Sequence, residues 1–148
     1  MKEKGILLPV FSLPSKYGIG DFGYEAYEFI DILSENGIDY WEILPINACR
    51  ELPYSPISYY ALDENYISLD KLIENGLIKS ARKRNIKDRV VYSDFKKKYF
   101  KEAFENFKKN DEYKEFVKNN EIKKYAQYMS SKTKETKDFY LFSQPCWR

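Results

Sequence analysis

The chain contains no histidine and only two cysteines among its 148 residues. Without histidine, a Ser-His-Asp arrangement for nucleophilic catalysis is excluded within this chain. Cys49 and Cys146 lie too far apart in the sequence for a CxxC or zinc-ligand pattern, so we assign no metal ligand. No apolar run approaches the roughly 18 residues of a membrane span, and no signal-peptide architecture is present at the N-terminus. We therefore expect a cytoplasmic protein with reduced thiols and no membrane partner.

Charge is unevenly distributed, although the net charge is only +2. Residues 1–78 hold 5 Lys/Arg and 13 Asp/Glu, whereas residues 79–148 hold 20 and 10. The basic part interleaves Lys with Phe and Tyr, a mixture that could bind nucleic acid by phosphate neutralisation and stacking. Its aromatic residues recur at helical spacing, however, which favours a buried stripe with Lys on the solvated face. We predict no nucleic-acid partner.

A strand, a helix and a second strand are predicted in the first part of the chain. Residues 6–11 form a nearly all-apolar run, which is typical of a parallel strand buried on both faces. Residues 24–36 have helical periodicity, with one apolar stripe made by Ala26, Phe29, Ile30 and Leu33. Residues 40–46 are a second aromatic and branched run. This order predicts a βαβ unit with parallel strands.

Local signals mark the ends of the first helix and indicate further helices. Asp21 favours a helix N-terminus, and Gly37 supplies a C-terminal stop. Further helices are expected over residues 69–75, 94–109, 111–119 and 121–129. Between them we expect a basic connector at 80–87 and a loop at 130–137, and an apolar run follows at 139–142.

Three glycines follow the first predicted strand. Gly18, Gly20 and Gly23 match the GxGxxG dinucleotide-binding pattern formally. In that motif the phosphate loop follows its strand directly, but here residues 12–17 intervene with two prolines. We interpret these glycines as residues that allow the loop to turn.

A tyrosine-rich segment, ELPYSPISYYALDENY at residues 51–66, follows the second predicted strand. Flat aromatic faces bordered by hydroxyl groups suit sugar rings, which are apolar on their faces and polar at their rims. Tyr60 and Tyr66 are interpreted as core residues, and Tyr54, which lies between prolines, as a candidate sugar-binding residue. Glycosyl transfer needs a pair of carboxylates. Since no convincing pair lies at a strand end, we assign no catalytic residue.

Several stretches resemble one enzyme family. GILLPVFSLPSKYGIGDFGYEAYEFIDIL closely resembles the opening of 4-alpha-glucanotransferases of the amylomaltase (disproportionating enzyme) family. YWEILPI resembles the second barrel strand of that family, and PYSPISYYALDENYISLDKLIENGLI aligns without gaps on the segment that follows. DRVVYSDFKKKYFKEAFENFKK resembles the start of the family's helical insertion. KYAQYMSSK and FYLFSQ are weaker matches to its later helices.

This resemblance implies an α/β fold, namely the N-terminal part of a (β/α)8 TIM barrel with a mostly helical insertion. Residues 1–78 would hold the first two strands, the first helix and the loops of the catalytic rim. Residues 79–148 would form the basic helical insertion subdomain. A whole barrel takes about 250 residues or more, so the resemblance covers only part of one. The missing C-terminal part of the barrel is then an expected partner.

The resemblance also implies an activity and a binding residue. The family transfers α-1,4-glucan segments between malto-oligosaccharides by a retaining mechanism, with no cofactor. Its catalytic carboxylates lie in later parts that have no counterpart here, so the isolated chain is expected to be inactive. Tyr54 occupies the position of a glucan-contacting tyrosine in the family's Ser-Pro-Tyr motif, although Leu52 replaces the serine and the loop at 47–51 is shortened. The alternative is a non-catalytic glucan-binding or interaction module derived from such an enzyme.

Overall fold

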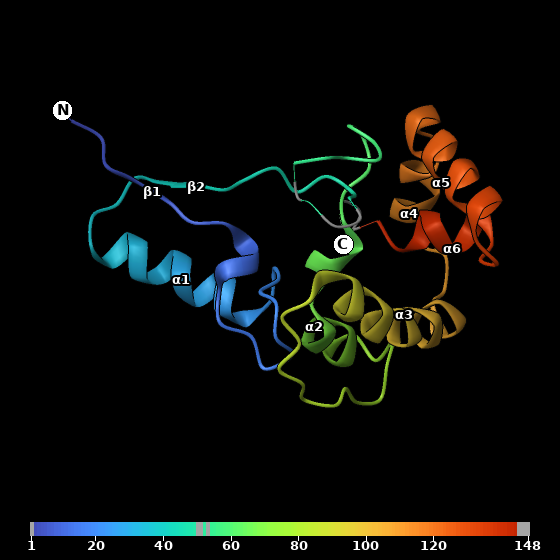
Figure 1. Ribbon diagram of the computed structural model, residues 1–148, viewed down its shortest axis with the longest axis horizontal. Coiled ribbons are helices and arrows are strands. Elements are labelled where there is room, and N and C mark those ends of the chain that lie inside the picture. The colour runs from blue at the N-terminus through green and yellow to red at the C-terminus, as the bar shows by residue number, and fades with distance from the viewer. Residues whose placement is uncertain (1, 50–51, 53, 145–148) are drawn as a thin grey trace.

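Figure 1 presents the computed structural model of the chain, which describes residues 2–49, 52 and 54–144. A small βαβ unit forms one end of the molecule, and helices gather at the other. The elements in chain order are β1 (Gly5–Leu7), η1 (Val10–Ser12), α1 (Tyr24–Glu35), β2 (Tyr40–Glu42), η2 (Glu64–Tyr66), α2 (Leu69–Glu74), α3 (Arg89–Asn106), α4 (Asp111–Phe116), α5 (Asn120–Lys132) and α6 (Lys137–Phe142). No helix in the described ranges has the length and apolar character needed to cross a membrane.

The predicted parallel pairing of the two strands is confirmed. β1 and β2 pair in parallel, with Gly5 opposite Tyr40 and Leu7 opposite Glu42. Helix α1 makes the connection, and it packs Phe29 against Trp41 of β2 with ring centroids 5.1 Å apart. The first strand is shorter than predicted, because the chain passes from Pro9 into the helical turn η1. Proline lacks the N–H group that would continue a strand ladder.

The prediction that the first strand is buried on both faces is wrong for the described part of the chain. α1 covers the face that includes Leu8 and Trp41, where these residues pack with Phe29. The opposite face carries Leu7 and Tyr40, which are each 55% exposed. No third strand pairs with β1 or β2 among the described residues, so neither sheet edge is covered there.

Helix α1 lies almost where its periodicity predicts. Gly37 follows it with φ of 63°, a left-handed conformation that ends helices at low cost for glycine. Ala26 and Leu33 of the predicted stripe are buried, but Ile30 is exposed. Asp21 does not cap the helix as predicted, since Gly23 is the N-cap residue and the Asp21 side chain is buried elsewhere.

The helical part begins earlier and extends further than its sequence predicts. α3 starts at Arg89, because the Asp88 side chain accepts a hydrogen bond from Val91 N at 2.9 Å and caps the helix there. α5 runs to Lys132, into the predicted loop. The apolar run 139–142 lies within α6, which Thr136 caps. All four residues of this apolar run are buried.

The largest hydrophobic core joins the two parts of the chain. It contains residues of α2, such as Leu72, and of the loop between η1 and α1 (residues 13–23, called here the first loop), such as Tyr17. Residues of α3 and α6 complete this core. Aromatic pairs fill its far end, where Phe104 contacts Phe139 and Phe142 at centroid distances of 5.9 and 5.4 Å. The helices therefore pack onto the segments that follow β1 and β2.

Candidate functional site

The residues before the tyrosine-rich segment and most of that segment form a two-limbed loop between β2 and η2, called here the aromatic loop (residues 46–49, 52 and 54–63). Its limbs are joined by backbone hydrogen bonds, from Ala48 N to Ala61 O at 2.8 Å and from Ile57 N to Ala48 O at 2.7 Å. The Asn47 side chain adds a bond to Tyr59 O at 2.9 Å. These bonds hold the described backbone of the two limbs together.

The tyrosines of this segment differ in exposure. Tyr66 is buried, as predicted, and its ring packs against Phe22. Tyr60 was predicted to be a core residue, and this is wrong, since it is 63% exposed. Its backbone N bonds to Ser58 Oγ at 3.2 Å in a tight local turn, which leaves its side chain outside the core. Tyr59 is 82% exposed.

Tyr54, the predicted sugar-binding residue, lies in a turn of the loop. Ser55 N donates to Leu52 O at 3.1 Å across this turn. The Tyr54 side chain is 65% exposed, and Leu52 beside it is exposed as well. An exposed ring with a hydroxyl at its rim can contact the apolar face of a sugar and a sugar hydroxyl together.

The base of the aromatic loop is held by one buried carboxylate. Asp63 accepts hydrogen bonds from Asn65 N at 2.8 Å and from the Cys49 thiol at 3.4 Å. It also forms an ion pair with Arg89, the first residue of α3. Asp63 therefore joins both limbs of the loop to the helical part.

The glycine-rich loop after η1 is explained by close backbone packing. Gly18 has φ of 119°, and a Cβ placed there would overlap the backbone of Ile86. A Cβ on Gly20 would overlap Val10 O. These positions need glycine because the first loop passes directly against other backbone segments. This explains the glycines without a bound phosphate.

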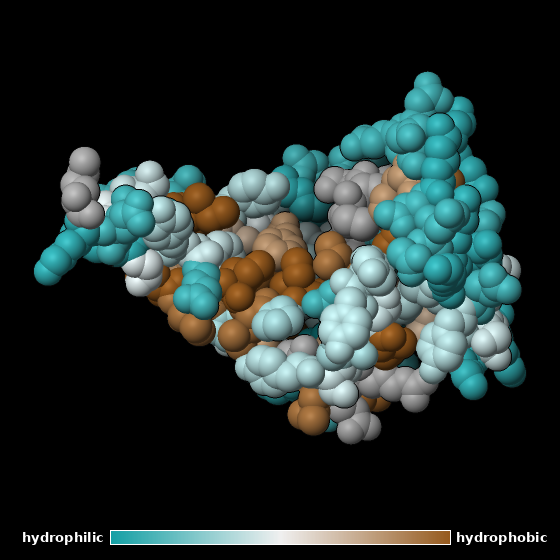
Figure 2. Space-filling view, turned by 90° about the horizontal axis from the view of Figure 1, so that it is seen from above, coloured by the Kyte–Doolittle hydropathy of each residue, from teal (hydrophilic) through white to brown (hydrophobic). Residues whose placement is uncertain are grey.

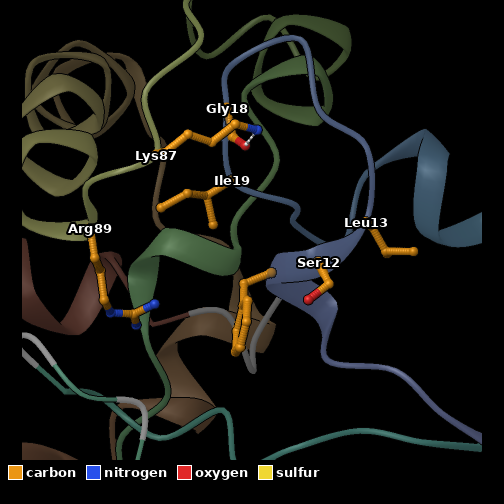
Figure 3. A pocket seen from close by; sticks show the side chains of 7 residues that line it. Ser12, Leu13, Gly18, Ile19, Lys87 and Arg89 are labelled. Atoms are coloured by element: carbon orange, nitrogen blue, oxygen red, sulfur yellow. Dashed lines mark hydrogen bonds between the residues drawn. The ribbon is translucent and has the colours of Figure 1, made fainter.

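A cavity of about 480 Å³ lies beside this glycine-rich loop. Lys87 and Arg89 approach it from one side, and Ser12 and Leu13 line it from another (Figure 3). Lys87 Nζ donates to Gly18 O at 3.0 Å, so this cation is already used to hold the loop. Sequence reasoning missed the cavity, because its walls are separated by about 70 residues of the chain.

One lysine of the basic part is completely buried, contrary to the prediction of a solvated lysine face. Lys96 Nζ on α3 donates to Asn65 O at 2.8 Å and to Ile67 O, and it lies 3.5 Å from Asp21 Oδ2. Burial lowers the pKa of the Lys96 ammonium and raises the pKa of the Asp21 carboxyl. Lys96 thus joins α3 to the loop before α1, to η2 and to the residue that follows η2.

A smaller cavity of about 240 Å³ lies between the aromatic loop and the helices. Cys49 and Ile57 line it from the loop, and Asp94 and Tyr125 line it from α3 and α5. Glu64 also faces it, and burial raises the pKa of this carboxyl. Within the described ranges, no group of three or more His, Cys, Asp or Glu residues could hold a metal ion.

Comparisons with known proteins agree with each other. A family model described as 4-alpha-glucanotransferase matches residues 8–146. The 4-alpha-glucanotransferase of Aquifex aeolicus is 40% identical over 162 aligned residues, which cover 97% of this chain and 32% of that protein. The chain thus spans about a third of the length of this curated relative.

Two solved structures are similar to the chain. The amylomaltase from Streptococcus agalactiae in complex with acarbose has a TM-score of 0.65 at 25% identity, over 89% of this chain and 27% of that one. The amylomaltase from Corynebacterium glutamicum has a TM-score of 0.73 at 15% identity, over 98% of this chain and 26% of that one. The second match supports the fold only.

Proposed function

The chain belongs to the 4-alpha-glucanotransferase family, and on that basis we propose that it forms the N-terminal portion of an enzyme that transfers α-1,4-glucan segments between malto-oligosaccharides. The observation that carries this proposal is the family match over residues 8–146, combined with coverage of about a third of a relative. The proposed role of the portion is to bind and position the glucan.

The chemistry of the proposed reaction requires groups outside this chain. In a retaining transfer, one carboxylate forms a covalent glycosyl-enzyme intermediate and a second acts as acid and then as base. We assign neither carboxylate to residues 1–148. Both are proposed to lie in the remaining part of the family polypeptide, so the isolated chain would bind glucan without turning it over. A second reading, a non-catalytic glucan-binding module, makes the same prediction for this chain alone.

Tyr54 is the proposed glucan-binding residue. Its ring is exposed in a turn of the aromatic loop, whose two limbs are fixed by backbone hydrogen bonds. Because the backbone of both limbs is already held, little backbone freedom is lost when a sugar stacks on the ring. The structural neighbour from Streptococcus agalactiae is an amylomaltase in complex with acarbose, and this supports the proposal of a glucan ligand for this chain.

The proposed architecture is the start of a (β/α)8 barrel. β1 and β2 would be its first two strands, and the face with Leu7 and Tyr40 would be covered by the rest of the barrel. Figure 2 shows apolar residues gathered in the hollow between the arm with β1 and β2 and the hydrophilic helices. Open strand edges and an exposed apolar face favour association with further strands. The C-terminal part of the barrel is therefore the proposed partner.

The remaining assignments belong to the same proposal. Residues 1–78 would supply the barrel strands and the rim loops, and residues 79–148 the helical insertion. The enzyme would be cytoplasmic and would need no cofactor. Neither nucleic acid nor a membrane is proposed as a partner.

Glucan binding is tested by titrating the 148-residue chain with maltoheptaose in a calorimeter. Tyr54→Ala should lower the affinity by about fivefold to tenfold, the loss expected for one aromatic stacking contact. Tyr59→Ala is the matched control, since Tyr59 lies in the same loop and is more exposed. This control should leave the affinity for maltoheptaose unchanged. Equal affinities for Tyr54→Ala and the unchanged chain would contradict the role of Tyr54.

Turnover is tested with maltotriose. The chain alone should release no glucose and form no longer glucans, whereas a mixture with the C-terminal part of a family member should do so if the barrel is completed. Turnover by the pure chain would refute the assignment of both carboxylates to the remaining part. Binding without turnover in every mixture would favour the glucan-binding module.

A further inference from the structure

We infer that the helical part positions the aromatic loop for glucan binding, and that Gln144 is a positioning residue in this role. The inference rests on the proposed function of Tyr54. It concerns a residue that follows α6, far along the chain from the loop it holds. Figure 1 shows the residues directly after α6 running toward the segment that connects β2 and η2.

The contact made by Gln144 is specific. Its side chain is completely buried, and its Oε1 accepts a hydrogen bond from Leu62 N at 3.0 Å. The backbone N–H of Leu62 is a donor, so only the oxygen of the amide can face it. The Nε2 group has no hydrogen-bond partner within the part of the chain that the structure describes. The described contact of the Gln144 side chain is therefore made through its amide oxygen.

Two further contacts hold the same loop from the helical part. Tyr125 and Met129 of α5 pack against Ala48, Ala61 and Ile57. Arg89 at the start of α3 pairs with Asp63, which also accepts from the Cys49 thiol. α5 thus contacts both limbs of the loop, whereas α3 and the residues after α6 contact its second limb, at Asp63 and Leu62. Contacts on both limbs restrict its backbone more than its internal hydrogen bonds alone.

These contacts, called here the bracing of the aromatic loop, should affect the affinity for glucan. An ordered loop presents Tyr54 in one orientation, whereas a loose loop must be ordered when glucan binds. Removing the acceptor at Gln144 also leaves the half-buried Leu62 N–H without that hydrogen bond, which favours local opening. Loss of bracing should therefore weaken glucan binding even though Gln144 is buried and contacts no ligand.

The test compares Gln144→Leu with Gln127→Leu, a matched change at an exposed position on α5. Amide hydrogen exchange is followed at Leu62 and Ile57, with Leu72 in α2 as the reference for global stability. Gln144→Leu should speed exchange in the loop by on the order of fivefold relative to Leu72, because one hydrogen bond is lost. Its maltoheptaose affinity should fall by about threefold or more. Gln127→Leu should change neither.

A second variant keeps the test decisive if Gln144→Leu does not fold. Met129→Ala removes a half-buried contact with the loop and should also speed exchange at Ile57. Unchanged loop exchange in a folded Gln144→Leu or Met129→Ala chain would overturn the inference. If loop exchange changes but Tyr54→Ala leaves affinity unchanged, the bracing stands and the proposed role of Tyr54 fails.

Discussion

Replacing the buried Lys96 should measure how much its contacts between the two parts of the chain contribute to stability. Lys96→Met keeps an unbranched apolar side chain about as long as the lysine stem and removes the ammonium group. The Asp21 carboxyl then remains buried without its cation, and the carbonyl groups of Asn65 and Ile67 lose their donor. Each of these groups was satisfied by one nitrogen atom, so a single substitution affects all three.

The expected loss is large. Removing one partner of a buried ion pair costs about 3–5 kcal/mol, because the other charge remains uncompensated. Since domains of this kind have a free energy of unfolding of about 5–15 kcal/mol, the variant would lose a large share of its stability. With a urea dependence of about 1–3 kcal/mol per molar, the midpoint should shift by more than about 1 M.

The assay is urea unfolding followed by circular dichroism, with Lys98→Met as the control. Lys98 lies on the same helix but is exposed, so its loss should cost no more than about 1 kcal/mol. The double variant Asp21→Asn/Lys96→Met should be less destabilised than the sum of the single variants, by about 1–3 kcal/mol. Additive effects, or equal midpoints for Lys96→Met and Lys98→Met, would refute the reasoning.

The pH dependence of the stability loss in Lys96→Met tests the same ion pair independently. Burial raises the pKa of Asp21, while Lys96 lowers it. Without Lys96 the pKa of this carboxyl in the folded state rises further. A carboxyl with a raised pKa in the folded state contributes stability at low pH and loses it as pH rises through that pKa. The penalty of Lys96→Met should therefore be smaller at acidic pH than at neutral pH, and a larger acidic penalty would contradict the assignment.

Three further outcomes are expected. Burial raises the pKa of Tyr66 to about 12 and that of Tyr92 as well. Such tyrosines stabilise the fold below about pH 10 and lose this contribution at higher pH, so urea titrations should show the unfolding free energy falling above pH 10 by about 1.4 kcal/mol per pH unit for each group; a flat profile would contradict this. Gly18→Ala should destabilise by about 2 kcal/mol or more, measured by urea unfolding, because its φ is positive and Ile86 leaves no space for a methyl group. Leu7→Lys should change stability by less than about 0.5 kcal/mol yet reduce light scattering from aggregates, since Leu7 is exposed beside an open strand edge.

Features set by neighbouring residues could be predicted from the sequence. Helix α1 and its end at Gly37 follow from periodicity and from the conformational freedom of glycine over a few residues. The parallel pairing of β1 and β2 follows from the helix between them. The exposed face with Leu7 could not be foreseen in the same way. An apolar strand carries no information about whether its covering elements are present.

Features set by distant residues could not be predicted. Asp21 precedes a helix, and that position favours a cap, but Lys96 lies 75 residues further on and holds its carboxyl instead. In the candidate site, the position of Tyr54 outside the core could be predicted, because prolines and a serine flank it in the sequence. The hydrogen bond between Leu62 N and the Gln144 side chain could not, since 82 positions separate the two residues. Buried hydrogen bonds of this kind leave no periodic signal.

Some of the charged residues of the acidic first part and the basic second part meet at the junction of the two parts. The acidic first part supplies Asp21 and Asp63, and the basic second part supplies Lys96 and Arg89, and these form two buried pairs across the junction. Buried pairs add little net stability compared with apolar packing, but a wrong alignment would leave charges uncompensated. They therefore favour one alignment of α3 on the loops after β1 and β2. Because Asp63 also closes the base of the aromatic loop, the same pairing that aligns the helices holds the base of the loop that carries Tyr54.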